Sequence, residues 1–413
     1  MSTHPPGRAR AGAASWGPRL RSDALGGVSL VAGTVAALVW ANWPGSDSYR
    51  RAWEAVAAWS GPLGLHLTVR DWIDQTLLLG FFVLIGLEIR REVTTGALGS
   101  WRRAGVPVAA ALGGMAAPAL IYTSVTAGSP GVRGWGVPMA TDVAFALGAL
   151  SLAGARAAPR LRVFLMTLAV ADDIGSVVVL VCFYSVDVRA VWLVAAIVLV
   201  AAMAAVRRST TGWSGAQLAL GLAAWVALLY AGVEAAVVGV AIGALAPAVI
   251  RVPIDPDPHR LSPVPGARRW ELRLIPAVNL VALPMFALAN AGVALAGSGL
   301  ATGDALRVFA AVLVARIVGK PVGIVAAKLL SARLLTSGYD DGVAGRGLAG
   351  LGATASIGFT IPLLVIRNAF PEGALASGAT AGLLAASVAG GVGGTLLLGL
   401  HRRTPRVPVH ETG

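Results

Sequence analysis

The sequence predicts an all-α polytopic membrane protein with about twelve transmembrane helices. Of its 413 residues, 56% are hydrophobic and 13% are charged, whereas roughly a quarter of a typical soluble domain is charged. Apolar stretches of about 20 residues, the length that a helix needs to cross a bilayer, recur from end to end. One of them, residues 161–184, carries two adjacent aspartates near its centre.

Hydropathy averaged over about 19 residues separates twelve apolar spans. They cover residues 26–43, 72–90, 105–126, 135–153, 161–184, 188–206, 214–232, 234–251, 274–296, 305–330, 347–367 and 373–400. The integral membrane domain is therefore predicted at 26–400, between an N-terminal tail at 1–25 and a C-terminal tail at 401–413.

Arginine and lysine gather in alternate connections between these spans. The enriched connections follow spans two, four, six, eight and ten, and both tails are basic as well. Because short cytoplasmic loops carry an excess of positive charge, we expect both termini in the cytoplasm. The long connection at 252–272 is rich in proline, and we predict a disordered or extended linker between two halves.

Composition also narrows the class of protein. The net charge of +13 does not indicate nucleic-acid binding, because the basic residues lie singly or in pairs without forming a stripe. The one cysteine, Cys182, lies inside span five and is interpreted as a buried, inert thiol. The five histidines lie in tails and loops without ligand spacing, so we expect no cofactor and no resident metal. No Ser/His/Asp set or phosphate loop in a strand context indicates an enzyme.

The adjacent aspartates Asp172 and Asp173 lie near the middle of span five. A carboxylate at the bilayer midplane costs several kcal/mol, so ionisable residues there are usually functional. The alternatives are a satisfied structural pair, or a short helix buried in a soluble core. Ionisable pairs at this depth are rarely structural, so the pair predicts ion transport.

Two spans are interrupted by polar and helix-breaking residues. Span four contains Pro138 followed by Thr141 and Asp142, and span eleven reads GLGATASIGFTIPLL at 350–364. Close helix packing through small residues would explain the glycines, but it explains neither the prolines nor Asp142. Interrupted helices at corresponding places of two repeats indicate a transporter binding site.

Span ten places two cations at depth. Lys320 lies near its centre, directly before a proline, and Arg316 lies four residues earlier on the same helical face. A charge partner inside the bundle is expected for Lys320. Arg316 either acts on Lys320 by like-charge repulsion, or points elsewhere and pairs with a group such as Asp142 in a structural role.

Several ordered motifs resemble the NhaA-type sodium/proton antiporter family. The matching stretches extend from SDALGGVSL near residue 22 through span twelve, and they include LIGLEIRREVTTGALGSWRRAGVPVAAALGGMAAPALIY, GWGVPMATDVAFALGALSLAG, FLMTLAVADDIG, LPMFALANAGV, VGKPVGI and IGFT. The resemblance implies two inverted repeats, formed by spans three to five and ten to twelve, whose broken helices, spans four and eleven, cross at the midplane. It also implies the inner membrane of a bacterial cell.

The resemblance assigns roles to residues at matching positions. It implies that Asp172 and Asp173 bind sodium or lithium and carry protons, while Thr141, Asp142 and Lys320 support the site. Carboxylate, hydroxyl and carbonyl oxygens suit a hard cation, by analogy with calcium and magnesium. Two adjacent carboxylates at depth favour protonation of one of them, so protons and sodium can compete. The acidic residues at positions that the family uses for pH regulation are Glu88, Glu92 and Glu271.

The chain departs from the family pattern at three places. Asp74-Gln75 stands where the family usually has Asn-Asp, and a carboxylate moved by one residue turns about 100° round a helix. This puts in doubt a role for Asp74 near the cytoplasmic funnel. Leu272 and Ile275 replace histidines next to Glu271. Arg316 is the third departure.

The function predicted is electrogenic exchange of sodium or lithium for protons, with two protons per sodium, serving pH and sodium homeostasis. An uncoupled cation channel or a non-transporting membrane sensor on the same scaffold is the alternative. The expected partners are transported Na⁺, Li⁺ and H⁺ and membrane lipids, and a homodimer is left open.

Overall fold

A computed structural model of the chain describes most of the sequence. The described residues are 17–44, 47–57, 67–94, 96–152, 159–185, 187–207, 215–246, 249–254, 257–293, 302–334, 343, 345–370 and 373–401. The predicted C-terminal tail and residues 1–16 of the predicted N-terminal tail thus lie outside the description, apart from His401. Helix α2 (Gly17–Ala41) already begins within the predicted N-terminal tail.

Six helices in this part of the chain are long and apolar enough to cross a membrane. Four are continuous: α4 (Val69–Thr94), α5 (Trp101–Val125), α7 (Pro159–Phe183) and α17 (Ala374–His401). The other two each contain a π-helical turn. They are α11 (Gly266–Ala277), η6 (Val278–Ala282) and α12 (Leu283–Asn290), and α13 (Gly303–Val314), η7 (Ala315–Gly319) and α14 (Lys320–Leu334).

The remaining predicted spans are shorter apolar helices or broken pairs. Spans one, six and seven correspond to α2, α8 (Ala190–Arg207) and α9 (Gly215–Ala231). Span four is divided into η3 (Pro130–Gly136) and α6 (Val143–Leu152), and span eleven into α15 (Gly345–Thr354) and α16 (Thr360–Ala369). Pro362 lies in the first turn of α16, where a proline costs no helical hydrogen bond.

The eighth span and the linker differ from the prediction. Instead of a helix over 234–251, the chain forms η5 (Ala235–Val237) and α10 (Val238–Ala244). An antiparallel hairpin of β1 (Val249–Ile254) and β2 (Asp257–Pro265) follows, and α11 begins at Gly266. The predicted disordered or extended linker at 252–272 is therefore a hairpin followed by a helix, because cross-strand hydrogen bonds pair its extended backbone.

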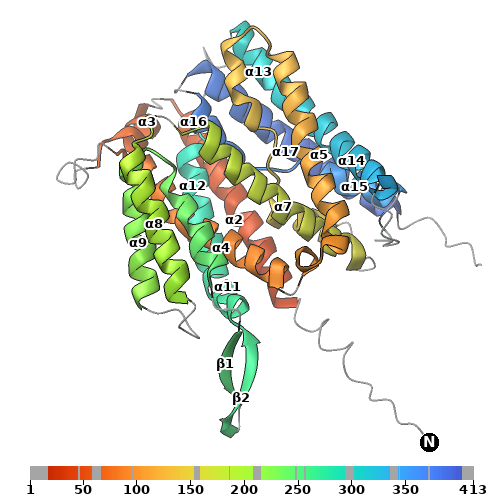
Figure 1. Cartoon of the computed structure of the whole chain (residues 1–413). Coiled ribbons are helices and arrows are strands. Elements are labelled where there is room, and N and C mark those ends of the chain that lie inside the picture. Colours follow the sequence, from red (N-terminus) through yellow and green to blue (C-terminus); the bar gives the residue numbers. More distant parts are fainter. Residues whose placement is uncertain are drawn as a thin grey trace, which may run out of the picture.

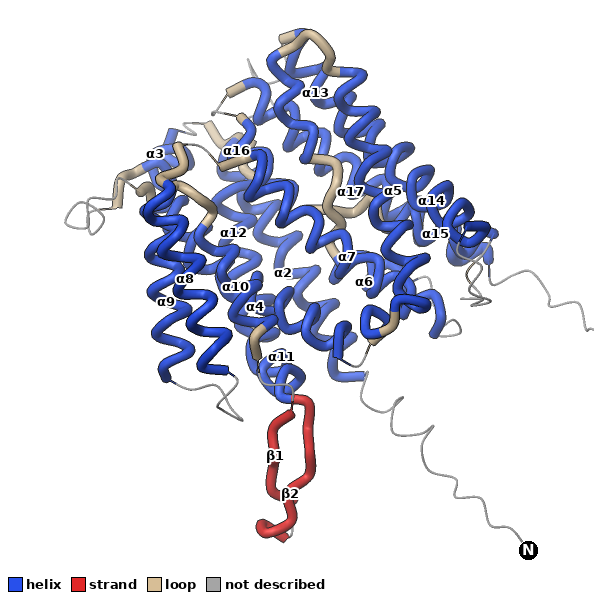
Figure 2. Tube along the Cα trace, viewed as in Figure 1, coloured by secondary structure: helices blue, strands red, loops and turns tan. Residues whose placement is uncertain are grey.

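Figure 1 shows the helices as one bundle from which the hairpin projects at the end where α2 begins. Helices α8 and α9 pack against each other at one edge, and α5 packs along α14 towards the opposite edge. The short helix α3 (Asp47–Glu54) lies at the end away from the hairpin. Apart from that hairpin, the elements drawn in Figure 2 are helices and loops.

The outer surface of the bundle is apolar, as expected for helices that face lipid. Val191 is 80% exposed and Val388 is 68% exposed. Inside, small residues bring helices together: a Cβ at Gly243 of α10 would collide with the α4 backbone. Cys182 is exposed, so the prediction of a buried thiol is wrong. Its side chain lies on the outward face of α7.

Candidate functional site

The interruptions of spans four and eleven meet inside the bundle. The hydroxyl of Thr141 donates to the carbonyl of Ala355 (3.0 Å), and the backbone N–H of Asp142 donates to the carbonyl of Ile357 (2.9 Å). The hydroxyl of Thr360 donates to Oδ2 of Asp142 (3.3 Å). Each break therefore supplies partners for polar groups of the other, which is the condition for irregular backbone inside a membrane.

Asp172 forms a buried ion pair with Lys320. Nζ of Lys320 lies 2.9 Å from Oδ2 of Asp172, and the two side chains are 0% and 1% exposed. The same Nζ donates to the carbonyl of Met139, just before Thr141. The second carboxylate oxygen of Asp172, Oδ1, is buried without a hydrogen-bond partner among the described residues. Lys320 thus holds one oxygen of this carboxylate, and the other oxygen has no hydrogen-bond donor among the described residues.

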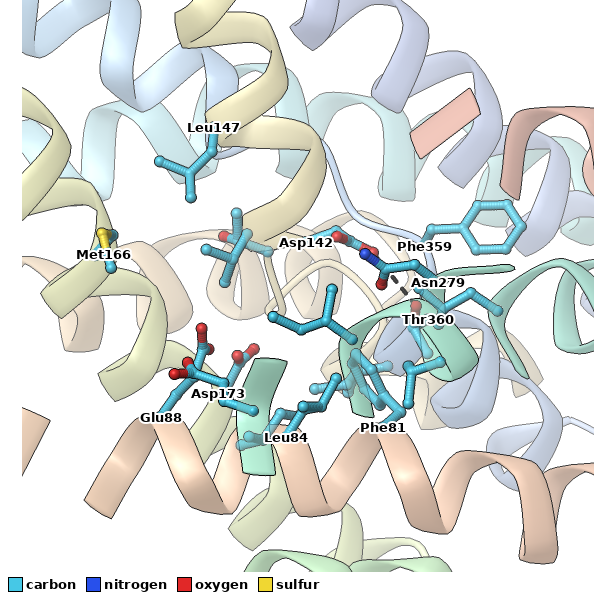
Figure 3. Close-up of a pocket in the computed structure, with 18 of the residues that line it drawn as sticks. Phe81, Leu84, Glu88, Asp142, Leu147, Met166, Asp173, Asn279, Phe359 and Thr360 are labelled. Atoms are coloured by element: carbon cyan, nitrogen blue, oxygen red, sulfur yellow. Dashed lines mark hydrogen bonds between the residues drawn. The ribbon is translucent and has the colours of Figure 1, made fainter. Parts of the chain in front are cut away.

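Asp173 faces a cavity instead. This cavity has a volume of about 120 Å³, and its lining includes Asp173, Glu88, Thr141 and Asp142. Figure 3 shows Glu88 from α4 and Asp173 from α7 at one end of the cavity, with Asp142 farther along it. Successive residues of an α-helix point about 100° apart. Helix α7 therefore presents one carboxylate to the ion pair and the next to the cavity.

Arg91 links two further acidic side chains that line the cavity. Its Nη1 lies 2.5 Å from Oε1 of Glu271, and its Nη2 lies 3.7 Å from Oε1 of Glu88. Glu92 has a different contact, because its Oε2 accepts the backbone N–H of Ala97 (3.1 Å) in η2 (Ala97–Gly99). Of the three acidic residues predicted to regulate pH response, Glu88 and Glu271 thus share one network, and Glu92 binds a neighbouring loop.

Arg316 lies at the crossing of the two broken helices. Its Nε donates to the carbonyl of Ser356 (3.0 Å), and its Nη1 and Nη2 donate to the carbonyls of Val137 (3.2 Å) and Ala140 (2.9 Å). The side chain is 0% exposed. All three hydrogen bonds run to backbone, so the expected alternative partner, Asp142, is not among its hydrogen-bond acceptors.

The departure at Asp74-Gln75 lies at the other end of α4 from Glu88. Asp74 and Asp71 both bind the guanidinium of Arg367 on α16, and Nδ2 of Asn290 donates to Oδ1 of Asp74 (2.8 Å). Fourteen residues of helix, about 21 Å, separate Asp74 from Glu88. Asp74 is therefore remote from the cavity that contains Asp173.

Gln75 and Glu234 form a small polar group at the end of α4 that carries Asp74. Oε1 of Gln75 accepts the backbone N–H of Ala235 (2.8 Å) at the start of η5. Glu234 lies in the connection between α9 and η5, and burial raises its pKa from 4.5 to about 7. Hydrogen bonds from Asn368, Ala236 and Gln75 counteract that rise. Although predicted span eight begins at Glu234, in the structure this residue lies in the connection before η5, ahead of the helices.

The sequence did not single out some residues of these sites. Asn279 and Arg162 line the cavity, and Arg367 closes the cluster around Asp74. Asn279 sits in the π-helical turn η6 of span nine, and a polar residue inside an apolar span was the signal that could have identified it. Nothing in the sequence indicated that Arg367 pairs with Asp71 and Asp74.

Known proteins resemble this chain over nearly its whole length. The family model described as Na⁺/H⁺ antiporter 1 matches residues 18–398. A protein of Frankia alni named Na(+)/H(+) antiporter NhaA 2 is 42% identical over 376 residues, covering 90% of this chain and 75% of the relative. A Nocardia farcinica protein named Na(+)/H(+) antiporter NhaA is 37% identical over 380 residues, covering 92% and 89%. A relative from Novosphingobium aromaticivorans, also 37% identical, covers 94% and 96%.

Proposed function

The chain belongs to the Na⁺/H⁺ antiporter 1 family, and we propose that it exchanges sodium for protons across the membrane. The observation that carries this proposal is the split environment of two adjacent carboxylates. Asp172 is held by Lys320, whereas Asp173 faces a cavity. A proton or a cation can reach Asp173 first, and a cation gains Asp172 only by displacing the lysine. Occupation by sodium and occupation by protons therefore exclude each other, as exchange requires.

Sodium is the cargo of this site, and the oxygen atoms around the cavity suit it. The carboxylate of Asp173 lies on this cavity together with Thr141 and Asp142, and Asp172 is the next residue to Asp173 in α7. Hard cations prefer such oxygen ligands, as calcium and magnesium do. Lithium has the same charge and the same preference, so we propose it as a second cargo.

Two groups can carry protons in the opposite direction. Asp173 must be ionised to bind sodium, and Lys320 loses its counter-ion when sodium takes Asp172. If both release a proton, two protons enter for each sodium exported. One net positive charge then moves inward in each cycle, so membrane voltage as well as the pH gradient drives transport. This electrogenic exchange would serve pH and sodium homeostasis.

The orientation of the protein sets the direction of this exchange. We propose a multi-pass protein of the bacterial inner membrane with both termini in the cytoplasm, because basic residues gather in the corresponding loops. The end of the bundle carrying the hairpin then faces the cytoplasm. The Glu88–Arg91–Glu271 network joins α4 to α11 beside the cavity, and we propose that it sets the response to cytoplasmic pH. Glu92 is assigned a supporting role through the α4–η2 loop.

Everted membrane vesicles test the exchange directly. With a quenched pH dye reporting an acid interior, sodium should restore fluorescence in the wild-type protein. Asp172→Asn and Asp173→Asn keep side-chain volume but remove the charge for which sodium and protons compete, so each should abolish the response. Asp304→Asn, an exposed carboxylate at the start of α13, is the matched control and should respond normally. Near-normal exchange by Asp173→Asn would refute the assignment.

The same vesicles separate the alternatives. An uncoupled channel would pass ²²Na⁺ without moving protons, and a non-transporting sensor would bind sodium without flux. Imposing an inside-positive voltage with potassium and valinomycin should accelerate sodium uptake into everted vesicles if two protons leave for each sodium. Chemical crosslinking in native lipid tests for a homodimer.

A further inference from the structure

Arg316 is the largest fully buried side chain among the described residues, and the exchange cycle does not use its charge. A buried cation is costly unless it is paired or fully hydrogen-bonded. Within the described part of the chain, its guanidinium binds three backbone carbonyls and no carboxylate. The partners of this side chain are therefore backbone carbonyls of two chain segments and not an ion.

The three carbonyls belong to both broken helices. Val137 and Ala140 follow the end of η3, and Ser356 follows the end of α15. These carbonyls lie in the interruptions themselves, and a buried carbonyl costs free energy unless a donor pairs with it. A planar guanidinium can bind several oxygens in a fixed fork, which a lysine ammonium cannot reproduce. Arg316 thus joins the interruptions of both broken helices and pairs carbonyls of each at once.

Ser356 and Gly358, both in the interruption of span eleven, allow Arg316 to make these contacts. The residue lies in the π-helical turn η7, and its own carbonyl accepts the hydroxyl of Ser356 (2.6 Å). Gly358 supplies the necessary space, because a Cβ there would collide with the guanidinium and lie 2.7 Å from the carbonyl oxygen of Ala140. Lys320, by contrast, donates to a single carbonyl, that of Met139.

We propose that Arg316 is a positioning residue that clamps the two broken helices at their crossing and leaves Lys320 free to be the exchangeable counter-ion of Asp172. When sodium displaces Lys320, the crossing then keeps its geometry, and Thr141 and Asp142 stay in place as ligands. The transport consequences rest on the proposed exchange of sodium for protons. The stability consequences do not, since they concern only the folded bundle.

Transport kinetics test the positioning role. Arg316→Lys keeps the charge but loses the fork, and Gly358→Ala keeps Arg316 but displaces it. Both should raise the KM for sodium by about tenfold, since misplaced ligands weaken binding. The maximal rate per folded protein should stay within about twofold of wild type, because the proton-carrying groups are unchanged. Gly148→Ala, in α6 with free space at the Cβ, is the matched control and should keep the wild-type KM.

Thermal unfolding in detergent tests the division of roles without reference to transport. The double variant Asp172→Asn/Lys320→Met removes both charges of the pair, and its midpoint should stay within about 3 °C of wild type. Arg316→Met frees three buried carbonyls, and its midpoint should fall by more than about 5 °C. The same fall should appear when Arg316→Met is added to the double variant.

The outcomes are distinct. A wild-type KM in folded Arg316→Lys and Gly358→Ala would overturn the positioning role and leave Arg316 as a packing element only. A midpoint for the double variant as low as that of Arg316→Met would overturn the division of roles, because Lys320 would then also hold the crossing. If the wild-type protein exchanged no sodium, the proposed function would fail, and the unfolding data alone would decide whether Arg316 clamps the helices.

Discussion

Removing one member of the Asp172–Lys320 pair should destabilise the protein more than removing both. At 2.9 Å and an effective dielectric constant of about 20, the attraction is about 6 kcal/mol. Because both side chains are buried, either partner left alone keeps a charge without its hydrogen-bonded counter-ion. Such a loss costs about 3–5 kcal/mol, whereas neutral replacement of a whole buried pair is often tolerated. We expect about 3–5 kcal/mol for Asp172→Asn and for Lys320→Met, and less for the double variant.

A double-mutant cycle measures this coupling. The twelve tryptophans provide an intrinsic fluorescence signal for unfolding of purified protein in detergent. Asp173→Asn is the matched control: it removes the adjacent carboxylate, which forms no ion pair with any residue that the structure describes, and should change stability by less than about 1 kcal/mol. If the double variant lost the full sum of the two single losses, the pair would contribute no coupling, and the lysine would not be the counter-ion of Asp172.

Three further predictions concern regions away from this pair. Burial raises the pKa of Glu234 to about 7 from 4.5, so the unfolded chain releases this proton first as pH rises. Stability should therefore fall between about pH 4.5 and 7, and Glu234→Gln should flatten that part of a melting-temperature profile; a profile of unchanged slope would contradict this. Asp74→Asn should cost about 3 kcal/mol and Asp71→Asn less than about 1 kcal/mol in the same unfolding assay, because only the first carboxylate is fully buried beside Arg367; equal losses would refute the distinction. His259→Gln should leave the pH profile of transport unmoved, and a shift of about one unit would show that this histidine participates.

The sequence by itself predicted the membrane-spanning class, the approximate bounds of most spans and a candidate ion site. Hydropathy depends on stretches of about 20 residues, so it can be read without knowing which helices are neighbours. The cost of burying charge made Asp172, Asp173 and Lys320 conspicuous for the same local reason. Proline and glycine marked both helix breaks, since their effect on the backbone is also local.

Only the tertiary structure decided which groups these residues meet. Helical periodicity places Arg316 and Lys320 on one face, but their acceptors are carbonyls of distant segments, and every residue carries a carbonyl. Sequence therefore offered Asp142 as a partner for Arg316, whereas the acceptors are Val137, Ala140 and Ser356. The hairpin within 249–265 and the outward face of Cys182 also depend on cross-strand pairing and helix orientation. Partners are fixed by packing in three dimensions, which a linear pattern of residue types does not specify.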